Sequence, residues 1–172
     1  DASADVLEHV ETWVRAVPDR EPIATRPGYL RGFWTPHAVS LRVLALCRYG
    51  GYAGGLPKGL EQFLYKNLCF LADHVETDVG GNHLFENGAA LAVGGAAFPR
   101  HGQQFVDGGL SVLPAACEGQ FLDADHHYER SPMYHPAVTK RLLTTVPVLA
   151  GASVAAPPCP RDTTTLSFGV TV

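Results

Sequence analysis

The chain has 172 residues, a formal net charge of -4 and an ordinary hydrophobic content of 46%. This length fits one domain and is enough to bury a hydrophobic core. The acidic balance excludes the broad basic surface that nucleic acid requires, although an anionic polymer could bind through cations gathered in a cleft. No apolar run reaches the roughly 18–20 residues that span a bilayer. We therefore expect a domain that binds neither nucleic acid nor membrane.

The cysteines lie far apart and form no CxxC pair: Cys47, Cys69, Cys117 and Cys159. This spacing argues against a structural zinc site and against a disulfide scaffold, and it favours buried reduced thiols. A metal site built from His126, His127 and His135 is disfavoured, because neighbouring loop histidines rarely bind one ion together. We expect no metal and no cofactor.

The opening segment "DASADVLEHV" lacks the basic and apolar regions of a signal peptide. The chain does not begin with Met, so the sequence leaves export undecided. We expect a periplasmic or secreted protein if the full-length protein has a signal peptide, and a cytoplasmic protein otherwise.

Helical periodicity dominates the first 150 residues. The first predicted helix, 4–17, has an apolar stripe formed by Val6, Val10, Trp13 and Val17. An irregular stretch follows over 19–35. The next helix, 36–50, has proline in its first turn and Gly50 as its end signal. The longest pattern covers 56–77, and its apolar face consists of Leu60, Leu64, Leu68 and Leu71.

Three further segments complete the helical part. A helix over 82–98 is almost wholly apolar after Asn87. A weaker helix over 102–121 is interrupted by Gly108, Gly109 and Pro114. After a polar loop, a last helix covers 132–150. No strand pattern occurs before residue 150, so we predict an all-α fold of helical hairpins packed side by side, as in a bundle or toroid.

The segment 151–172 differs in character, being rich first in proline and then in threonine. We interpret residues 1–150 as the helical domain. The tail 151–172 is either a linker to a β domain or aberrant, non-native sequence.

Polar residues gather at the start of the helix predicted over 82–98. Asn82, His83, Glu86 and Asn87 are three or four positions apart and therefore share one side of the first turn. The helix dipole there attracts anions. Helix capping is the alternative, and it accounts for one or two of these residues.

A second polar group, "HYERSPMYHP", covers 127–136. Tyr134 and His135 follow Pro132 at a predicted helix start. A tyrosine can act as an acid or a base where neighbouring cations lower its pKa from about 10, and Arg130 and His135 are candidate cations. The alternative is a tyrosine packed between helices with its hydroxyl bonded to backbone.

Together, "GNHLFENGAAL" (81–91) and "HYERSPMYHPAV" (127–138) resemble the helical domain of the heparinase II/III-type polysaccharide lyases, which include related alginate lyases. The segment "FWTPHAVSLRVLALCRYG" (33–50) is also similar to that family. The similarity runs from Trp13 to Leu143. It implies an incomplete α/α toroid, followed in the family by a β-sandwich partner domain that this sequence does not contain.

The resemblance also implies β-elimination on an acidic polysaccharide, such as heparan sulfate, alginate or an exopolysaccharide. By motif, Asn82 neutralises the uronate carboxylate, His83 assists it or acts as base, and Tyr134 is the acid. The substrate-binding residues implied are Glu86, Arg130, His135, Trp34 and His37. A core position is an equal alternative for Trp34. Because the family completes its site with a residue of the β domain, we expect little or no lyase activity from this chain alone.

Two other functions remain as alternatives. A helical glycoside hydrolase needs two opposed carboxylates, and Glu86 with Glu129 or Asp125 is the available pairing. A non-catalytic carbohydrate-binding or scaffold domain would keep the fold without the chemistry.

Overall fold

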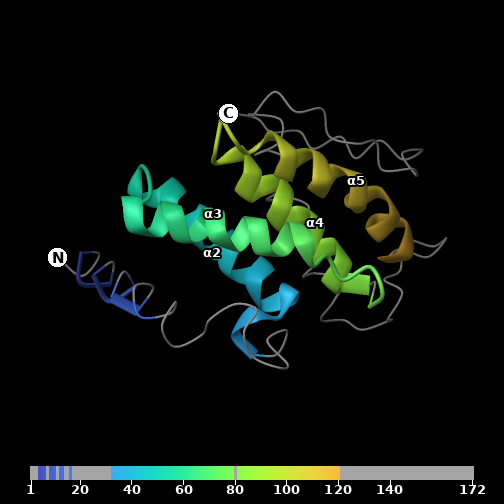
Figure 1. Cartoon of the computed structure of the whole chain (residues 1–172), viewed down its shortest axis with the longest axis horizontal. Helices are drawn as coiled ribbons and strands as arrows, with labels where there is room; N and C mark the ends of the chain where they lie inside the picture. Colours follow the sequence, from blue (N-terminus) through green and yellow to red (C-terminus); the bar gives the residue numbers. More distant parts are fainter. Residues whose placement is uncertain are drawn as a thin grey trace, which may run out of the picture.

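The computed structural model describes residues 4–6, 8–10, 12, 13, 16, 32–79 and 81–120. Of residues 119 and 120 it describes the backbone alone. Its elements are η1 (Gly32–Trp34), α2 (Pro36–Ala53), α3 (Lys58–Asp73), α4 (Gly81–Ala96) and α5 (Gln103–Gln120) (Figure 1). This part of the chain contains no strand, which confirms the all-α prediction. The predicted helix 132–150 and the tail 151–172 lie outside the described residues.

Local chemistry sets the ends of α2. Thr35 caps the helix by accepting a hydrogen bond from the backbone N–H of Ala38 at 3.4 Å, and Pro36 occupies the first turn. The sequence pattern predicted that this helix ends at Gly50, and this prediction is wrong. The helix continues to Ala53 and stops at Gly54, whose φ of 73° is left-handed and therefore suits glycine.

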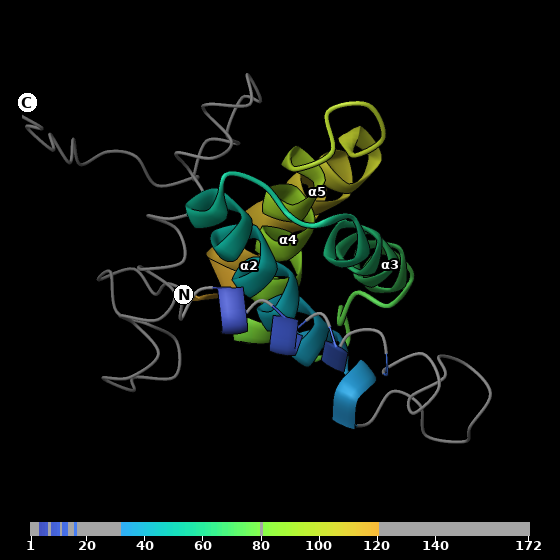
Figure 2. The same ribbon diagram turned by 90° about the vertical axis from the view of Figure 1, so that its left-hand side faces the viewer.

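Consecutive helices run in opposite directions, so α2 and α4 run the same way (Figure 1). Viewed from the side, α4 lies among the other helices and packs most extensively against α5 (Figure 2). Gly94 lies at the crossing of three helices, because a methyl group there would be 2.8 Å from Val43 Cγ1 on α2 and 2.6 Å from Leu68 Cδ2 on α3. Successive hairpins of this kind are compatible with part of a toroid, which stays a prediction.

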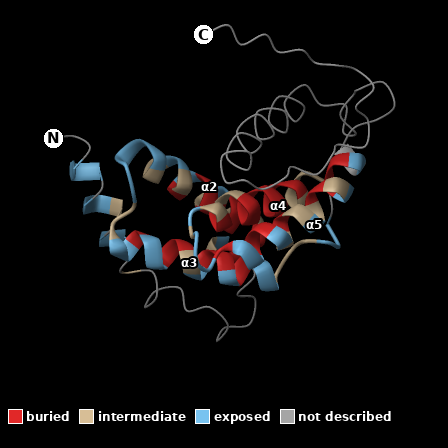
Figure 3. Cartoon of the chain, turned by 90° about the horizontal axis from the view of Figure 1, so that it is seen from above, coloured by how far each residue is buried: buried red, intermediate tan, exposed pale blue. Residues whose placement is uncertain are grey.

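The core lies between these helices, and buried residues are concentrated along α4 (Figure 3). The predicted apolar face of α3 is confirmed, since each of its leucines has an exposed fraction of 0%: Leu60, Leu64, Leu68 and Leu71. The stripe predicted over 4–17 is wrong in part, and its member Val17 lies outside the described residues. Val10 packs against the core, whereas Val6 and Trp13 are 57% and 46% exposed.

A seam of glycines joins α4 to α5. Gly88 and Gly95 on α4 face Gly109 and Gly102 in antiparallel register. A methyl group on Gly95 would lie 2.7 Å from the carbonyl oxygen of Gly102, and one on Gly109 would lie 2.5 Å from that of Gly88. The absence of a Cβ therefore lets the two backbones touch. The prediction that Gly109 weakens this helix is wrong, because here the glycine is a packing requirement.

Two adjacent glycines allow a matched test of this seam. We expect Gly109→Ala to lower the free energy of unfolding by about 1–3 kcal/mol, because the new methyl group meets backbone that cannot move aside cheaply. Nothing lies within 4 Å of the Cβ position of Gly108. Gly108→Ala should therefore stabilise the protein by about 0.5–1 kcal/mol. Urea denaturation followed by circular dichroism measures the free energy of unfolding of both variants. Equal effects of the two substitutions would contradict the claim that Gly109 is needed for the close approach of α4 and α5.

Candidate functional site

A buried amide lies at the centre of the polar residues of α4. The side chain of Asn87 has an exposed fraction of 0%. Its Oδ1 accepts a hydrogen bond from the backbone N–H of Glu76 at 2.8 Å, and its Nδ2 donates to Ser40 Oγ at 3.0 Å. Ser40 in turn donates to the carbonyl oxygen of Pro36 at 3.0 Å. Asn87 thus joins α4 both to the start of α2 and to the loop that precedes α4.

Three ionisable side chains meet beside this amide. His83 lies four residues before Asn87, in the first turn of α4, and its Nδ1 is 3.4 Å from Glu76 Oε1. The ring of His83 stacks on that of His37, with centroids 4.2 Å apart and planes inclined by 11°. The His83 side chain is 35% exposed and that of Glu76 is 16% exposed. The arrangement presents an accessible imidazole supported by a carboxylate and a second imidazole, which is suited to proton transfer.

The other predicted site residues occupy different surroundings. Asn82 precedes His83 in the same turn and is half-buried, while Glu86 is buried. Trp34 belongs to the core, with an exposed fraction of 2%, and its ring packs 5.0 Å from that of Phe70. The structure therefore brings His37 to His83 but holds Trp34 among apolar side chains. Three predicted residues lie outside the described part of the chain: Arg130, Tyr134 and His135.

Sequence analysis did not single out Glu76 or Ser40. Ser40 lies in an apolar helical stretch, where a small polar residue carries no signal of its own. Glu76 lies in the loop between α3 and α4, and its contact with His83 arises only because the chain reverses before α4. Gly81, whose φ is 58°, takes part in this reversal. No local periodicity reports such a contact between a loop and a helix.

A second polar contact is structural. Arg42 on α2 donates from Nε to Asn67 Oδ1 at 2.8 Å and from both terminal nitrogens to the carbonyl oxygen of Phe33 at 3.1 Å. Its guanidinium also lies 3.9 Å from the centre of the Phe33 ring. Burial lowers the pKa of Arg42 to about 10, so the group stays charged at neutral pH. Arg42 therefore ties α2 to α3 and η1.

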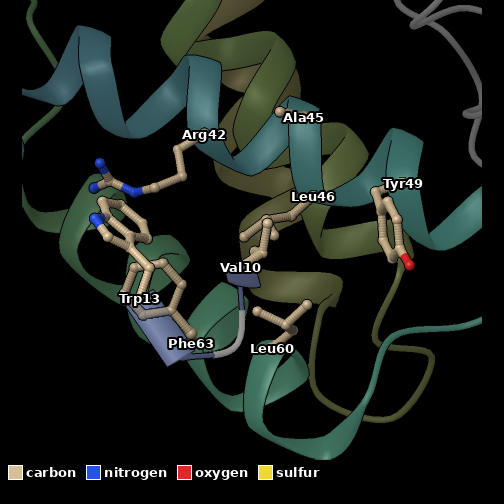
Figure 4. Close-up of a pocket in the computed structure, with 8 residues that line it drawn as sticks. All are labelled: Val10, Trp13, Arg42, Ala45, Leu46, Tyr49, Leu60 and Phe63. Carbon is tan, nitrogen blue, oxygen red and sulfur yellow. The ribbon is translucent and has the colours of Figure 1, made fainter. Parts of the chain in front are cut away.

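A pocket of about 310 Å³ opens between α2 and α3, beside Arg42 (Figure 4). Its lining is mostly apolar and consists of Val10, Trp13, Arg42, Ala45, Leu46, Tyr49, Leu60 and Phe63. Such a lining offers few hydrogen-bonding groups to a polyhydroxylated ligand. The cluster of His37, Glu76, His83 and Asn87 is therefore the better candidate site.

Two absences concern the residues that the structure describes. No group of three or more His, Cys, Asp and Glu side chains among these residues is arranged to hold a metal ion. None of the described helices combines the length and the apolar character that crossing a membrane requires.

Asn87 and Asn82 should differ in their effect on stability. We expect Asn87→Ala to lower the free energy of unfolding by about 1–3 kcal/mol, because the Glu76 N–H loses its acceptor in a partly buried position. Asn82→Ala, at a half-buried position in the same turn, should change it by only about 0.5 kcal/mol or less. Denaturant titration of both variants checks this difference. Comparable losses would show that Asn87 is not the anchor of the site.

Comparison with known protein families gives a match over most of the chain. A family model described as the heparinase II/III N-terminus matches residues 8–160, which is most of the chain. No curated protein and no solved structure shows significant similarity. The match includes α2 to α5 and every residue of the His37, Glu76, His83 and Asn87 cluster. The chain belongs to the heparinase II/III N-terminal family.

Proposed function

We propose that this chain is the helical part of a polysaccharide lyase, which cleaves uronic-acid-containing polysaccharides by β-elimination. Heparan sulfate, alginate and bacterial exopolysaccharides have the required uronate chemistry. The observation that carries the proposal is the accessible His83 imidazole, in contact with Glu76 and His37, in a chain of the heparinase II/III family. A hydrolase would instead need two opposed carboxylates, and Glu86, the one such candidate that the structure describes, is buried.

The first requirement of β-elimination is to make the proton at C5 of the uronate acidic. The neighbouring carboxylate opposes this, because removing the proton adds negative charge beside a group that is already anionic. In our proposal the Asn82 amide donates a hydrogen bond to that carboxylate and stabilises the enolate-like charge as it develops. Its place beside His83 at the start of α4 supports this role, since the positive end of the helix dipole favours anions.

The second requirement is a base and an acid. In our proposal His83 removes the C5 proton, the C4–C5 double bond forms and the bond from C4 to O4 breaks. Tyr134 protonates the departing O4, and it also acts as base where both protons lie on the same face of the sugar. Arg130 and His135 would bind the substrate, and a β-sandwich partner domain would complete the site; Glu86, being buried, is not given this role. No water is consumed, so the product is an unsaturated uronate.

The products of the reaction test this proposal. The chain, supplied with a β-sandwich partner domain, is incubated separately with heparan sulfate and with alginate, and ultraviolet absorbance of the conjugated uronate is compared with the number of new reducing ends. A lyase produces the two in equal amounts. We expect Asn82→Ala and His83→Ala to lower the rate by about 10²–10³-fold, since each removes a group that acts in the transition state. Glu61→Ala, at an exposed position on α3, is the control.

The other outcomes point to different functions. Reducing ends without ultraviolet absorbance would identify a hydrolase and contradict the proposal. Binding of the oligosaccharide without turnover, even with a β-sandwich domain supplied, would identify a non-catalytic carbohydrate-binding domain. In that case Asn82→Ala should weaken oligosaccharide binding measured by calorimetry, and no turnover should be detected in either protein.

A further inference from the structure

The contact between Glu76 and His83 has a defined polarity. Glu76 Oε1 lies 3.4 Å from His83 Nδ1. An ionised carboxylate can only accept hydrogen bonds, whereas each nitrogen of a neutral imidazole is either a donor or an acceptor. Neutral His83 can therefore satisfy this contact only with its proton on Nδ1. Its other nitrogen, Nε2, then carries the lone pair and is the basic atom of the ring.

Glu76 is itself held in place by Asn87. The buried Asn87 side chain accepts from the Glu76 backbone N–H at 2.8 Å, and its Nδ2 lies 3.5 Å from Glu76 Oε2. The two oxygens of the carboxylate are thus divided, one facing Asn87 and the other facing His83. Since Asn87 is also tied to Ser40 on α2, the carboxylate is positioned relative to two helices and not only by its own loop.

His37 supplies the remaining constraint. Its ring lies 4.2 Å from that of His83 and nearly parallel to it, at 11°. Stacking fixes the plane of the His83 ring but not its direction, because a half-turn of the ring keeps the plane and exchanges Nδ1 with Cδ2. The carboxylate of Glu76 decides between these two orientations by requiring a donor at the Nδ1 position. The two neighbours together define both the plane of the ring and the position of its protonated nitrogen.

We propose that Glu76 is a positioning residue that keeps neutral His83 protonated on Nδ1 and leaves Nε2 as the basic nitrogen. Histidine side chains in water favour the opposite tautomer, so Glu76 has to reverse an intrinsic preference. The importance of this for catalysis rests on the lyase function proposed above, in which His83 removes a proton. A base whose reactive nitrogen is defined before substrate binds does not need to reorganise during the reaction.

Nuclear magnetic resonance tests the tautomer directly in the whole chain. Long-range proton–nitrogen correlation spectra at alkaline pH, where imidazoles are neutral, show which ring nitrogen carries the proton. The His83 signals are assigned by their loss in His83→Gln. His74 is an internal standard, because its Nδ1 lies 2.8 Å from the carbonyl oxygen of Phe70, which can only accept, and it must therefore be protonated on Nδ1.

We expect His83 to be protonated on Nδ1 in the unaltered protein. In Glu76→Ala the proton should shift to Nε2, while His74 keeps its tautomer and Glu61→Ala changes neither residue. Protonation of His83 on Nε2 in the unaltered protein would overturn the proposal without the need for any variant. An unchanged tautomer in Glu76→Ala would overturn it as well.

This result is separable from the outcome for the lyase. Protonation of His83 on Nδ1 in a protein that never forms an unsaturated uronate, even with a β-sandwich domain supplied, would refute the proposed function and leave the role of Glu76 intact. Lyase activity in a protein whose His83 is protonated on Nε2 would support the proposed function and refute the role of Glu76. If both proposals hold, Glu76→Ala should lower kcat while KM changes little, because substrate binding does not use the carboxylate.

Discussion

The candidate site depends on one buried side chain, the amide of Asn87. A buried amide is costly unless its hydrogen bonds are made, and those of Asn87 go to Ser40 and to the backbone of Glu76. The same bonds fix the loop that carries Glu76 against the first turn of α4. The positions of His83 and its two neighbours therefore follow from satisfying an amide that has no access to water.

The remainder of α4 provides a rigid base for this turn. Its glycines let the backbone of α5 approach until the two helix backbones touch. Side chains from α2 and α3 pack against Gly94 at one crossing point. The helix is thus polar in its first turn and close-packed in most of the rest. This division explains how an apolar segment can hold several polar groups at one end: the packing fixes the helix, and the polar turn faces the start of α2.

Sequence analysis predicted most of the fold and part of the site. The leucine face of α3 and the helical class follow from periodicity, which depends only on local spacing. The role of Gly109 differs from the prediction, because the same residue that weakens an isolated helix permits close packing in a pair. His37 and His83 were identified from motifs, but Glu76 was not, since its role arises from a contact between a loop and a helix. The burial of Trp34 likewise depends on tertiary packing that no local pattern specifies.

The most direct test of this account is to map where a uronate oligosaccharide binds. Backbone amide shifts are recorded during titration with an alginate or heparan sulfate oligosaccharide. The account predicts that the largest changes occur at the start of α4 and α2 and in the loop between α3 and α4, at Asn82, His83, His37 and Glu76. Changes confined to the apolar pocket around Trp13 and Tyr49, or no changes at all, would contradict it.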